Sequence, residues 1–142
     1  MLAIDLFHNA VISEFVFEHN EIYANLTLSS AEMRLFRQVE NALRKDFPLP
    51  QIVVLLNAPL EVLLRNILKS APQFERKISE EFLKQLVNLY LEFFFQWEKT
   101  PILVVNSSTI KWDNSESVEL LLNFILSGEI RGIQYYSSED LF

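Results

Sequence analysis

The chain has 142 residues and a mass of 16.6 kDa, which predicts one domain over residues 1–142. Half of its residues are hydrophobic, which excludes a disordered chain and predicts a sizeable core. The formal net charge of −7 argues against a general binder of nucleic acid or anionic membranes, because such proteins present a basic face.

Two scarce residue types exclude several kinds of site. There is no cysteine, so these residues form no disulfide, thiolate nucleophile or cysteine-ligated metal site. The two glycines, Gly128 and Gly132, are too few for a phosphate-binding P-loop, a dinucleotide fingerprint or a nucleophile elbow. The sequence has neither the pattern of a signal peptide nor an apolar run of about 18–20 residues, and we expect a cytoplasmic protein.

The N-terminal third predicts one strand and one helix. The short apolar run at 10–13 is typical of a buried strand. Ser29 and Glu32 have the spacing of a capping box, and the helix that they open is expected to end near Phe47, where prolines follow. One face of this helix carries Phe36, Val39 and Leu43.

Two further runs, 51–56 and 101–105, are continuous, apolar and rich in β-branched residues. Such runs are typical of strands covered on both faces, as in a parallel sheet. With helical patterns between them, the order predicts an α/β fold: a mainly parallel sheet with flanking helices and right-handed crossovers. Ligands of such sheets bind at the carboxyl ends of the strands, which are here 13–14, 56–57 and 106–107.

Three helices are predicted around these strands. Pro59 occupies the first position of one helix. Ser79 caps the next helix, and the first turn of that helix carries two glutamates. Asp113 or Asn114 starts the last helix, and Gly128 is placed to end it.

Five segments follow one another in the order of the motifs of a known family. Residues 11–17 (VISEFVF) and 22–28 (IYANLTL) resemble a stretch of the bacterial deoxynucleoside kinases that is written viSDy-F, then ifA-LtL. Residues 51–59, 63–78, 79–95 and 101–106 resemble that family's next strand and turn, its lid, the helix after the lid and its PvLviD strand. The resemblance covers most of residues 9–110.

The resemblance implies a P-loop kinase fold and the ATP-dependent phosphorylation of a deoxynucleoside on its 5′-hydroxyl. ATP and Mg²⁺ are implied by the family alone. Because family members are usually longer at the N-terminus, the match corresponds to their C-terminal two-thirds. We therefore expect an N-terminally truncated relative without the first strands, the P-loop and the first catalytic carboxylate.

The family's lid carries arginines that surround the transferring phosphates, where planar cations stabilise spread negative charge. The matching positions here are Asn66, Ser70 and Pro72, the lid glycine is Ala71, and a downstream lysine has become His19. We expect a chain that is inactive by itself.

Two carboxylates keep family positions. Glu14 follows the first predicted strand and is the candidate catalytic residue; the alternative is a solvated carboxylate or a helix cap. Glu75 matches the lid glutamate that binds the deoxyribose 3′-hydroxyl, and is the candidate substrate-binding residue. Its alternative is a loop residue paired with Arg76 or Lys77.

Three cations are candidate phosphate-binding residues: Arg65, Lys69 and Arg76. Arg65 and Lys69 lie four residues apart on one helix face, and the alternative is a solvated face, because Arg65 precedes the family's register by one position. No cluster of His, Asp and Glu has metal-ligand spacing, so no metal site is predicted.

Three functions remain open: a kinase-family fragment or half of a split enzyme, an inactive relative kept as a binding or assembly subunit, and an α/β domain that oligomerises through its Phe-rich helix 79–97. In the family, the first strand lies between those matching 10–13 and 51–56. The 10–13 strand could move beside 51–56, or residues 2–7 or 132–136 could fill this place; otherwise we expect a homo-oligomer, or a partner that supplies a strand.

Overall fold

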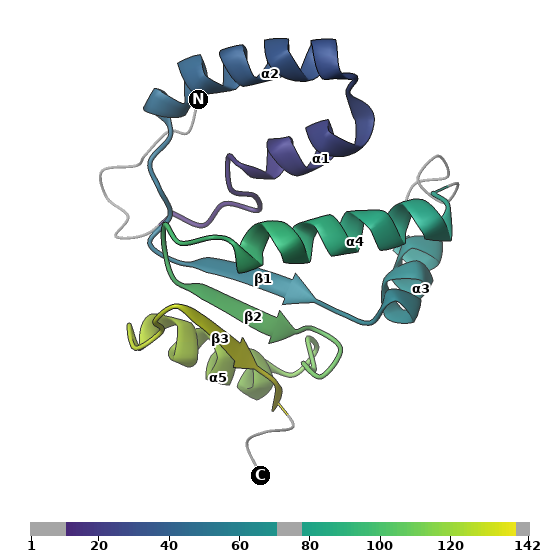
Figure 1. The fold of residues 1–142 in the computed structure, drawn as a ribbon. Helices are drawn as coiled ribbons and strands as arrows, with labels where there is room; N and C mark the ends of the chain where they lie inside the picture. The colour runs from purple at the N-terminus through teal and green to yellow at the C-terminus, as the bar shows by residue number, and fades with distance from the viewer. Residues whose placement is uncertain (1–10, 71–77, 139–142) are drawn as a thin grey trace. The chain divides into compact units, whose positions relative to one another are not determined.

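The computed structural model of the chain describes residues 11–70 and 78–138. The chain divides into two compact units, Met1–Phe47 and Pro48–Phe142. The described part of the first unit is helical, and the second contains the sheet (Figure 1). A single domain over residues 1–142 stays a prediction.

The first unit contains α1 (His19–Thr27), α2 (Ser30–Leu43) and a single 3₁₀ turn, η1 (Arg44–Asp46). The predicted capping box opens α2. The Ser29 hydroxyl accepts a hydrogen bond from the Glu32 backbone N–H at 3.4 Å, and the Glu32 carboxylate accepts one from the Ser29 N–H at 2.8 Å. The box satisfies backbone donors that the first turn of a helix leaves without partners.

The strand predicted at 10–13 is wrong for the residues that the structure describes there. Residues 11–13 form no strand, and Val11 and Ile12 are 55% and 93% exposed. An apolar run becomes a buried strand only where a neighbouring strand and a covering layer receive it, and the sheet here is built of other segments.

The face predicted for α2 is only partly right. Phe36 is half-buried, but Val39 and Leu43 are 51% and 47% exposed, whereas Glu40 is buried. The buried side of α2 is therefore not its most apolar side. It includes Glu40, because the Glu40 carboxylate contacts Arg44.

The sheet of the second unit consists of β1 (Val53–Asn57), β2 (Ile102–Asn106) and β3 (Ile133–Tyr136), in the order β1-β2-β3 and parallel throughout. The two predicted strands are confirmed with their bounds shifted by one or two residues. Residues 133–136 do not fill a place beside β1: they pair with β2, at the opposite edge of the sheet.

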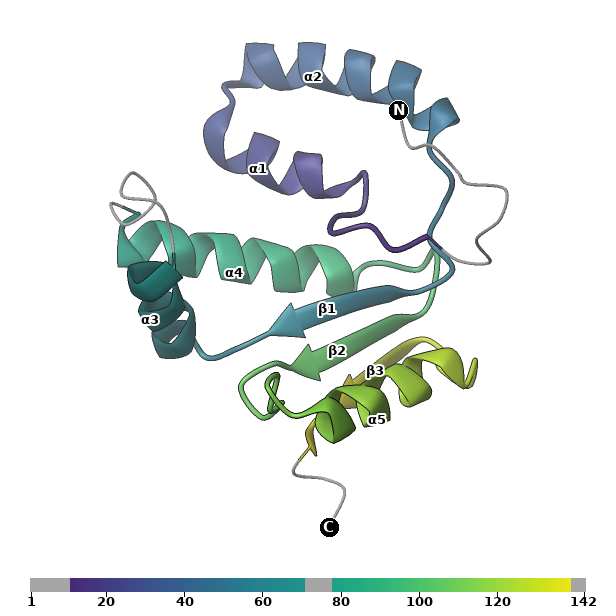
Figure 2. The same cartoon turned by 180° about the vertical axis from the view of Figure 1, so that it is seen from behind.

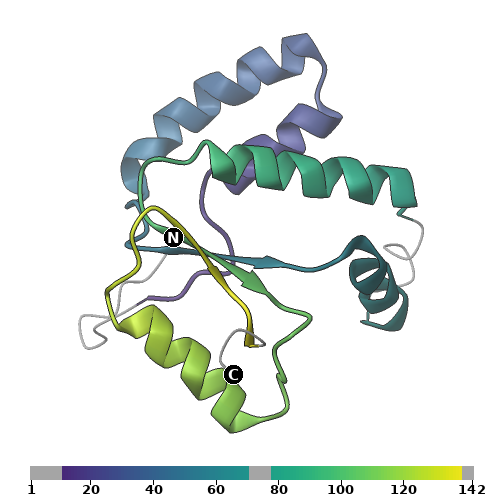
Figure 3. The ribbon, with the colours of Figure 1, turned by 60° about the horizontal axis from the view of Figure 1, so that its bottom comes forward.

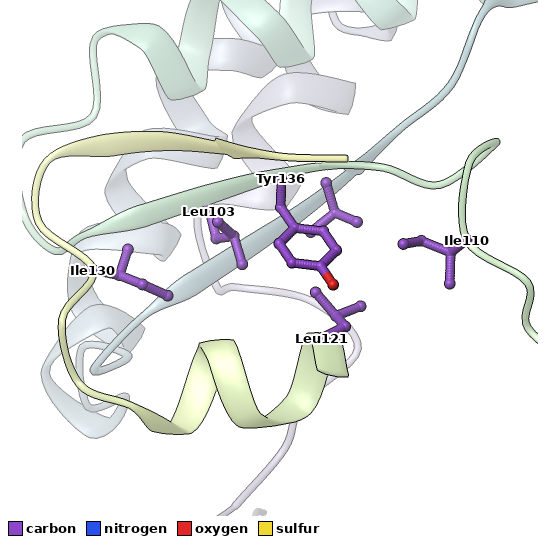
Figure 4. Close-up of a cluster of buried hydrophobic side chains, with 6 residues drawn as sticks. Leu103, Ile110, Leu121, Ile130 and Tyr136 are labelled. Carbon is purple, nitrogen blue, oxygen red and sulfur yellow. The ribbon is translucent and has the colours of Figure 1, made fainter. Parts of the chain in front are cut away.

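Helices cover both faces of this sheet (Figure 3). On one face, sheet residues meet α4 (Glu80–Phe95) through an apolar contact layer; on the other, they meet α5 (Ser115–Leu126). The α4 layer contains Leu55, Ile102, Val104, Ile133, Leu91, Phe94 and Phe95. The buried cluster on the α5 side contains Leu103, Val105, Ile110, Leu121, Ile130 and Tyr136 (Figure 4).

The two crossovers of this sheet have opposite hands. The chain moves in the same lateral direction from β1 to β2 and from β2 to β3, but it passes through α4 on one face and α5 on the other. The prediction of right-handed crossovers thus holds for one of them only. The return from α5 to β3 is short and uses Gly128 and Gly132, whose φ angles of 70° and 60° favour glycine.

The predicted helix starts in this unit are confirmed. The Ser79 hydroxyl accepts from the Phe82 N–H at 3.2 Å, and the Asn114 side chain accepts from the Ser117 N–H at 3.1 Å. Helix α3 (Leu60–Ser70) begins one residue after Pro59. In the parts of the chain that are described, no helix is long and apolar enough to cross a membrane.

We predict that Leu103→Ala lowers the free energy of unfolding of the second unit by about 2–5 kcal/mol, because it leaves a cavity at a fully buried position. Urea titration followed by the fluorescence of the buried Trp97 measures the change. Leu126→Ala, at a position that is 77% exposed, is the control and should change stability by less than about 0.5 kcal/mol. Equal effects of the two substitutions would contradict the described core.

Candidate functional site

The carboxyl ends of β1 and β2 carry two asparagines that lie side by side. Asn57 and Asn106 are register partners at the last position of each strand. The Asn57 carbonyl oxygen accepts hydrogen bonds from the Ser107 N–H at 2.8 Å and from the Ser107 hydroxyl at 3.0 Å. These bonds fix the loop after β2 on the end of β1.

The same loop is held by its own side chains. The Asn106 side-chain oxygen accepts from the Ser108 N–H at 3.2 Å and from its hydroxyl at 2.6 Å. The Thr109 hydroxyl donates to the Asn106 carbonyl at 2.9 Å, and the Trp112 indole N–H donates to the Ser107 carbonyl at 3.0 Å. Trp112 remains half exposed beside this loop.

The residues after β3 complete this edge. The Ser138 N–H donates to the Thr109 hydroxyl at 3.2 Å, and the Ser138 hydroxyl donates to the Thr109 carbonyl. The ends of all three strands are thus joined into one polar edge, which we call the rim: Asn57, Asn106 to Thr109, and Ser137 to Ser138. The rim offers amide, hydroxyl and backbone groups at the place where parallel sheets bind ligands.

The rim includes two of the three predicted strand ends, 56–57 and 106–107. Helix α3 follows β1 directly and lies beyond its carboxyl end (Figure 1). It presents Arg65 and Lys69 as exposed cations one turn apart. The third predicted cation, Arg76, and the predicted sugar ligand Glu75 lie outside the described residues.

Glu14 belongs to the first unit. It is exposed, in a bend where the Ser13 hydroxyl donates to the Phe15 carbonyl at 2.8 Å. Its catalytic role stays a prediction, as do the roles of Glu75, Arg65, Lys69 and Arg76. Nearby, the His19 ring lies between those of Phe15 and Tyr23, with ring centroids at 4.4 and 4.9 Å. Partial burial lowers the pKa of His19, which disfavours the imidazolium that a phosphate would require.

The first unit contains a charged cluster that the sequence did not predict. Arg44 Nη1 lies 2.8 Å from Glu18 Oε1, and Arg44 Nη2 lies 3.4 Å from Glu40 Oε1. Both carboxylates are buried, at 4% and 6% exposure. The guanidinium also lies over the Phe17 ring, 5.8 Å from its centroid. The spacing of Glu40 and Arg44 by one helical turn was a usable signal, but nothing in the sequence indicates Glu18, which is 26 residues away.

This cluster fixes the start of α1 to the end of α2. Burial raises the pKa of Glu40, the nearby Glu21 carboxylate raises it further, and Arg44 opposes the shift. One cation thus serves two buried carboxylates, so Glu40 lies in an environment that favours its neutral form.

The described residues do not fit Mg²⁺. No group of three or more His, Cys, Asp or Glu in 11–70 and 78–138 is placed to hold a metal ion. The rim consists of asparagine, serine and threonine, whereas Mg²⁺ sites use carboxylates with phosphate and water oxygens. No catalytic step is therefore assigned to a metal on these residues.

A parallel sheet between helices, with a polar rim at the carboxyl ends of its strands, defines an α/β domain suited to binding a ligand at that edge. The family model described as "Deoxynucleoside kinase" matches residues 3–125, and the chain belongs to this family. The fold is accordingly that of a P-loop kinase relative.

A relative supports the same assignment. The deoxyguanosine kinase of Bacillus subtilis (strain 168) is 32% identical over 80 residues, which are 56% of this chain and 39% of that protein. The match therefore spans well under half of the relative's length. No solved structure matches the chain.

We predict that the contribution of Glu40 to the stability of the first unit falls as pH rises from about 4 to 7, and that Glu40→Gln removes this contribution. Because the pKa of Glu40 is higher in the folded unit than in the unfolded chain, folding favours proton uptake, and the stabilisation is lost as the carboxyl ionises. Glu40→Gln should be more stable than the wild type at pH 7, and the difference should shrink towards pH 4.

Hydrogen exchange of the α2 amides measures this local stability, and Glu116→Gln, at an exposed position of α5, is the control. A difference between wild type and Glu40→Gln that stays constant over the whole pH range would contradict the assigned environment of Glu40.

Proposed function

We propose that this chain binds a deoxynucleoside or its nucleotide at the rim, and that by itself it does not catalyse the phosphoryl transfer of its family, the ATP-dependent 5′-phosphorylation of a deoxynucleoside. The observation that carries the binding proposal is the loop after β2, which is fixed on Asn57 and closes a polar edge. The name of the matched relative makes deoxyguanosine the first ligand to test.

Inactivity follows from the residues at hand. The 142 residues contain no sequence of the form GxxxxGK[ST], whose backbone N–H groups and lysine hold the transferring phosphates. The positions of the lid arginines are held by Asn66, Ser70 and Pro72, which supply no cation. ATP remains a family cofactor, and we assign no residue of this chain to Mg²⁺.

The remaining charges have roles in binding. We propose that Arg65 and Lys69, beyond the end of β1, contact phosphate, with Arg76 as a third cation. We propose that Glu75 accepts a hydrogen bond from the sugar 3′-hydroxyl, and that Glu14 orients a neighbouring cation. Arg65 and Lys69 are supported by their exposure and by the position of α3 after β1.

A second function is a non-catalytic binding or assembly subunit. Its support is the Phe-rich α4, where Phe95 is 51% exposed, and the edge position of β1. We propose that the chain forms a homo-oligomer or takes up a strand from a partner. A cytoplasmic location stays a prediction.

We predict no ATP-dependent turnover of deoxyguanosine by the purified 142-residue chain, because the loss of one transition-state cation already costs about 10³-fold or more in related phosphoryl transfers. Product formation is followed by chromatography. The double variant Arg65→Ala, Lys69→Ala is prepared in parallel to identify contaminating kinase. Turnover that the wild type shows and this variant lacks would contradict the proposal.

We also predict that Glu75→Gln weakens deoxyguanosine binding by about 1–3 kcal/mol, which is the cost of an imperfectly paired polar group, and that Glu14→Gln weakens it less. Calorimetric titration measures both, with Glu116→Gln as the matched control. Equal affinities of wild type and Glu75→Gln would identify Glu75 as a solvated loop residue.

A further inference from the structure

The loop after β2 uses most of its hydrogen-bond donors within the rim. Figure 2 shows this loop at the arrowhead end of β2, ahead of α5. The three backbone N–H groups of residues 107–109 all donate to Asn57 or Asn106, at distances of 2.8 to 3.2 Å. The three side-chain hydroxyls of the same residues donate to the same two asparagines, at 2.6 to 3.0 Å. These residues therefore offer no successive N–H groups of the kind that cradle a phosphate.

The Asn106 side chain is held in one orientation. Its Oδ1 accepts from the Ser108 N–H at 3.2 Å and from the Ser108 hydroxyl at 2.6 Å. A backbone N–H only donates, so the amide atom opposite it is the oxygen, and both lone pairs of that oxygen are used. The Nδ2 end of the amide consequently faces away from Ser108 and carries two N–H donors.

These two donors are accessible at the rim. Within residues 11–70 and 78–138, no buried side-chain nitrogen or oxygen atom lacks a hydrogen-bond partner. Asn106 is half-buried and its Nδ2 has no partner in this part of the chain, so Nδ2 reaches the surface. Asn57, its register partner, adds a second half-buried amide on the neighbouring strand, about 4.8 Å away. The rim thus presents uncharged donors side by side.

Uncharged donors suit the uncharged acceptors of a nucleobase. The exocyclic O6 of guanine accepts hydrogen bonds, whereas the corresponding amino group of adenine donates them. Because a carbonyl oxygen has two lone pairs, Asn106 and Asn57 can both donate to the same O6 atom. An adenine amino group at this place would face the Asn106 donor and leave both groups unpaired, which lowers affinity.

We propose that Asn106 gives the rim a preference for 6-oxopurine bases over 6-aminopurine bases, by donating from Nδ2 to the O6 carbonyl. Ser108 is a positioning residue, because its two bonds hold the Asn106 oxygen away from the ligand. The donor belongs to this chain in particular: the PvLviD motif that residues 101–106 resemble ends in Asp, which has no donor when ionised. The inference rests on the binding at the rim that is proposed above.

Three uncharged ligands test the preference on the wild-type chain. Deoxyguanosine and deoxyinosine both carry O6, and deoxyinosine lacks the 2-amino group, whereas deoxyadenosine carries an amino group in place of O6. We expect calorimetric titration to give Kd values for the first two ligands that agree within about threefold, and a Kd for deoxyadenosine that is at least about tenfold higher.

Asn106→Asp tests the donor itself. An aspartate keeps the oxygen that accepts from Ser108 and replaces the two outward N–H donors by a second acceptor. We expect the ratio of the deoxyadenosine Kd to the deoxyguanosine Kd to fall at least about tenfold. The matched control is Asn114→Asp, because Asn114 caps α5 and an aspartate caps a helix equally well, so its ratio should remain that of the wild type. Since the ligands are uncharged, the added negative charge acts alike on all of them.

Two further measurements test the positioning by Ser108. Ser108→Ala removes one of the two bonds that orient the Asn106 amide and should lower the ratio of Kd values, whereas Ser108→Thr keeps a hydroxyl and should preserve the ratio. In two-dimensional NMR of the labelled wild type, the Nδ2 signals of Asn106 should shift on titration with deoxyguanosine and with deoxyinosine.

Equal affinities of the wild type for deoxyguanosine and deoxyadenosine would overturn the inference and leave the proposed binding intact. An unchanged ratio in a folded Asn106→Asp variant would overturn it as well, and the fluorescence of the buried Trp97 shows whether the second unit of the variant is folded. Binding of none of the three nucleosides would contradict the proposed function itself, and the inference with it.

Discussion

The second unit depends on the burial of β2. Residues Ile102 to Val105 are 0–6% exposed, because each face of this strand packs against a different helix and each of its edges pairs with another strand. A strand buried in this way fixes the register of both neighbouring strands. The register in turn determines where along the strand direction all three strands end. The rim exists because Asn106 ends β2 level with Asn57, where Ser107 can bond to the Asn57 carbonyl.

The two units are stabilised by different kinds of interaction. The second has an apolar core, and its polar groups are collected at the end of the sheet. The first buries Glu18 and Glu40 around Arg44. The cost of removing these charges from water offsets much of their electrostatic attraction, but the contact requires one specific geometry. We propose that the rim binds the ligand, and the 142 residues contain no sequence of the form GxxxxGK[ST].

Much of the fold could be predicted because its signals are local. The runs that became β1 and β2, the capping box at Ser29 and the cap at Ser79 each depend on neighbouring residues. The strand expected at 10–13 failed because burial requires a receiving sheet, which no local pattern encodes. Residues 132–136 were considered only for a place beside β1, whereas 133–136 pair with β2. Glu18 and Glu40 both contact Arg44, and the contact with Glu18 is tertiary, so no local pattern indicates it. Of the candidate site, the ends of β1 and β2 were predictable, whereas residues 13–14 end no strand, and neither the end of β3 nor the bonds that join the three ends were predicted.

We propose that the rim is the ligand-binding edge of this chain, which belongs to the deoxynucleoside kinase family. Two-dimensional NMR of the labelled protein during titration with deoxyguanosine and with its monophosphate tests it most directly. We expect the backbone amides at Asn57 and at Asn106 to Thr109 to shift with both ligands. The amides of Arg65 and Lys69 should shift only with the monophosphate, and those of α5 near Leu126 should stay unchanged. Saturable shifts confined to other residues, or no shifts at millimolar ligand, would contradict it.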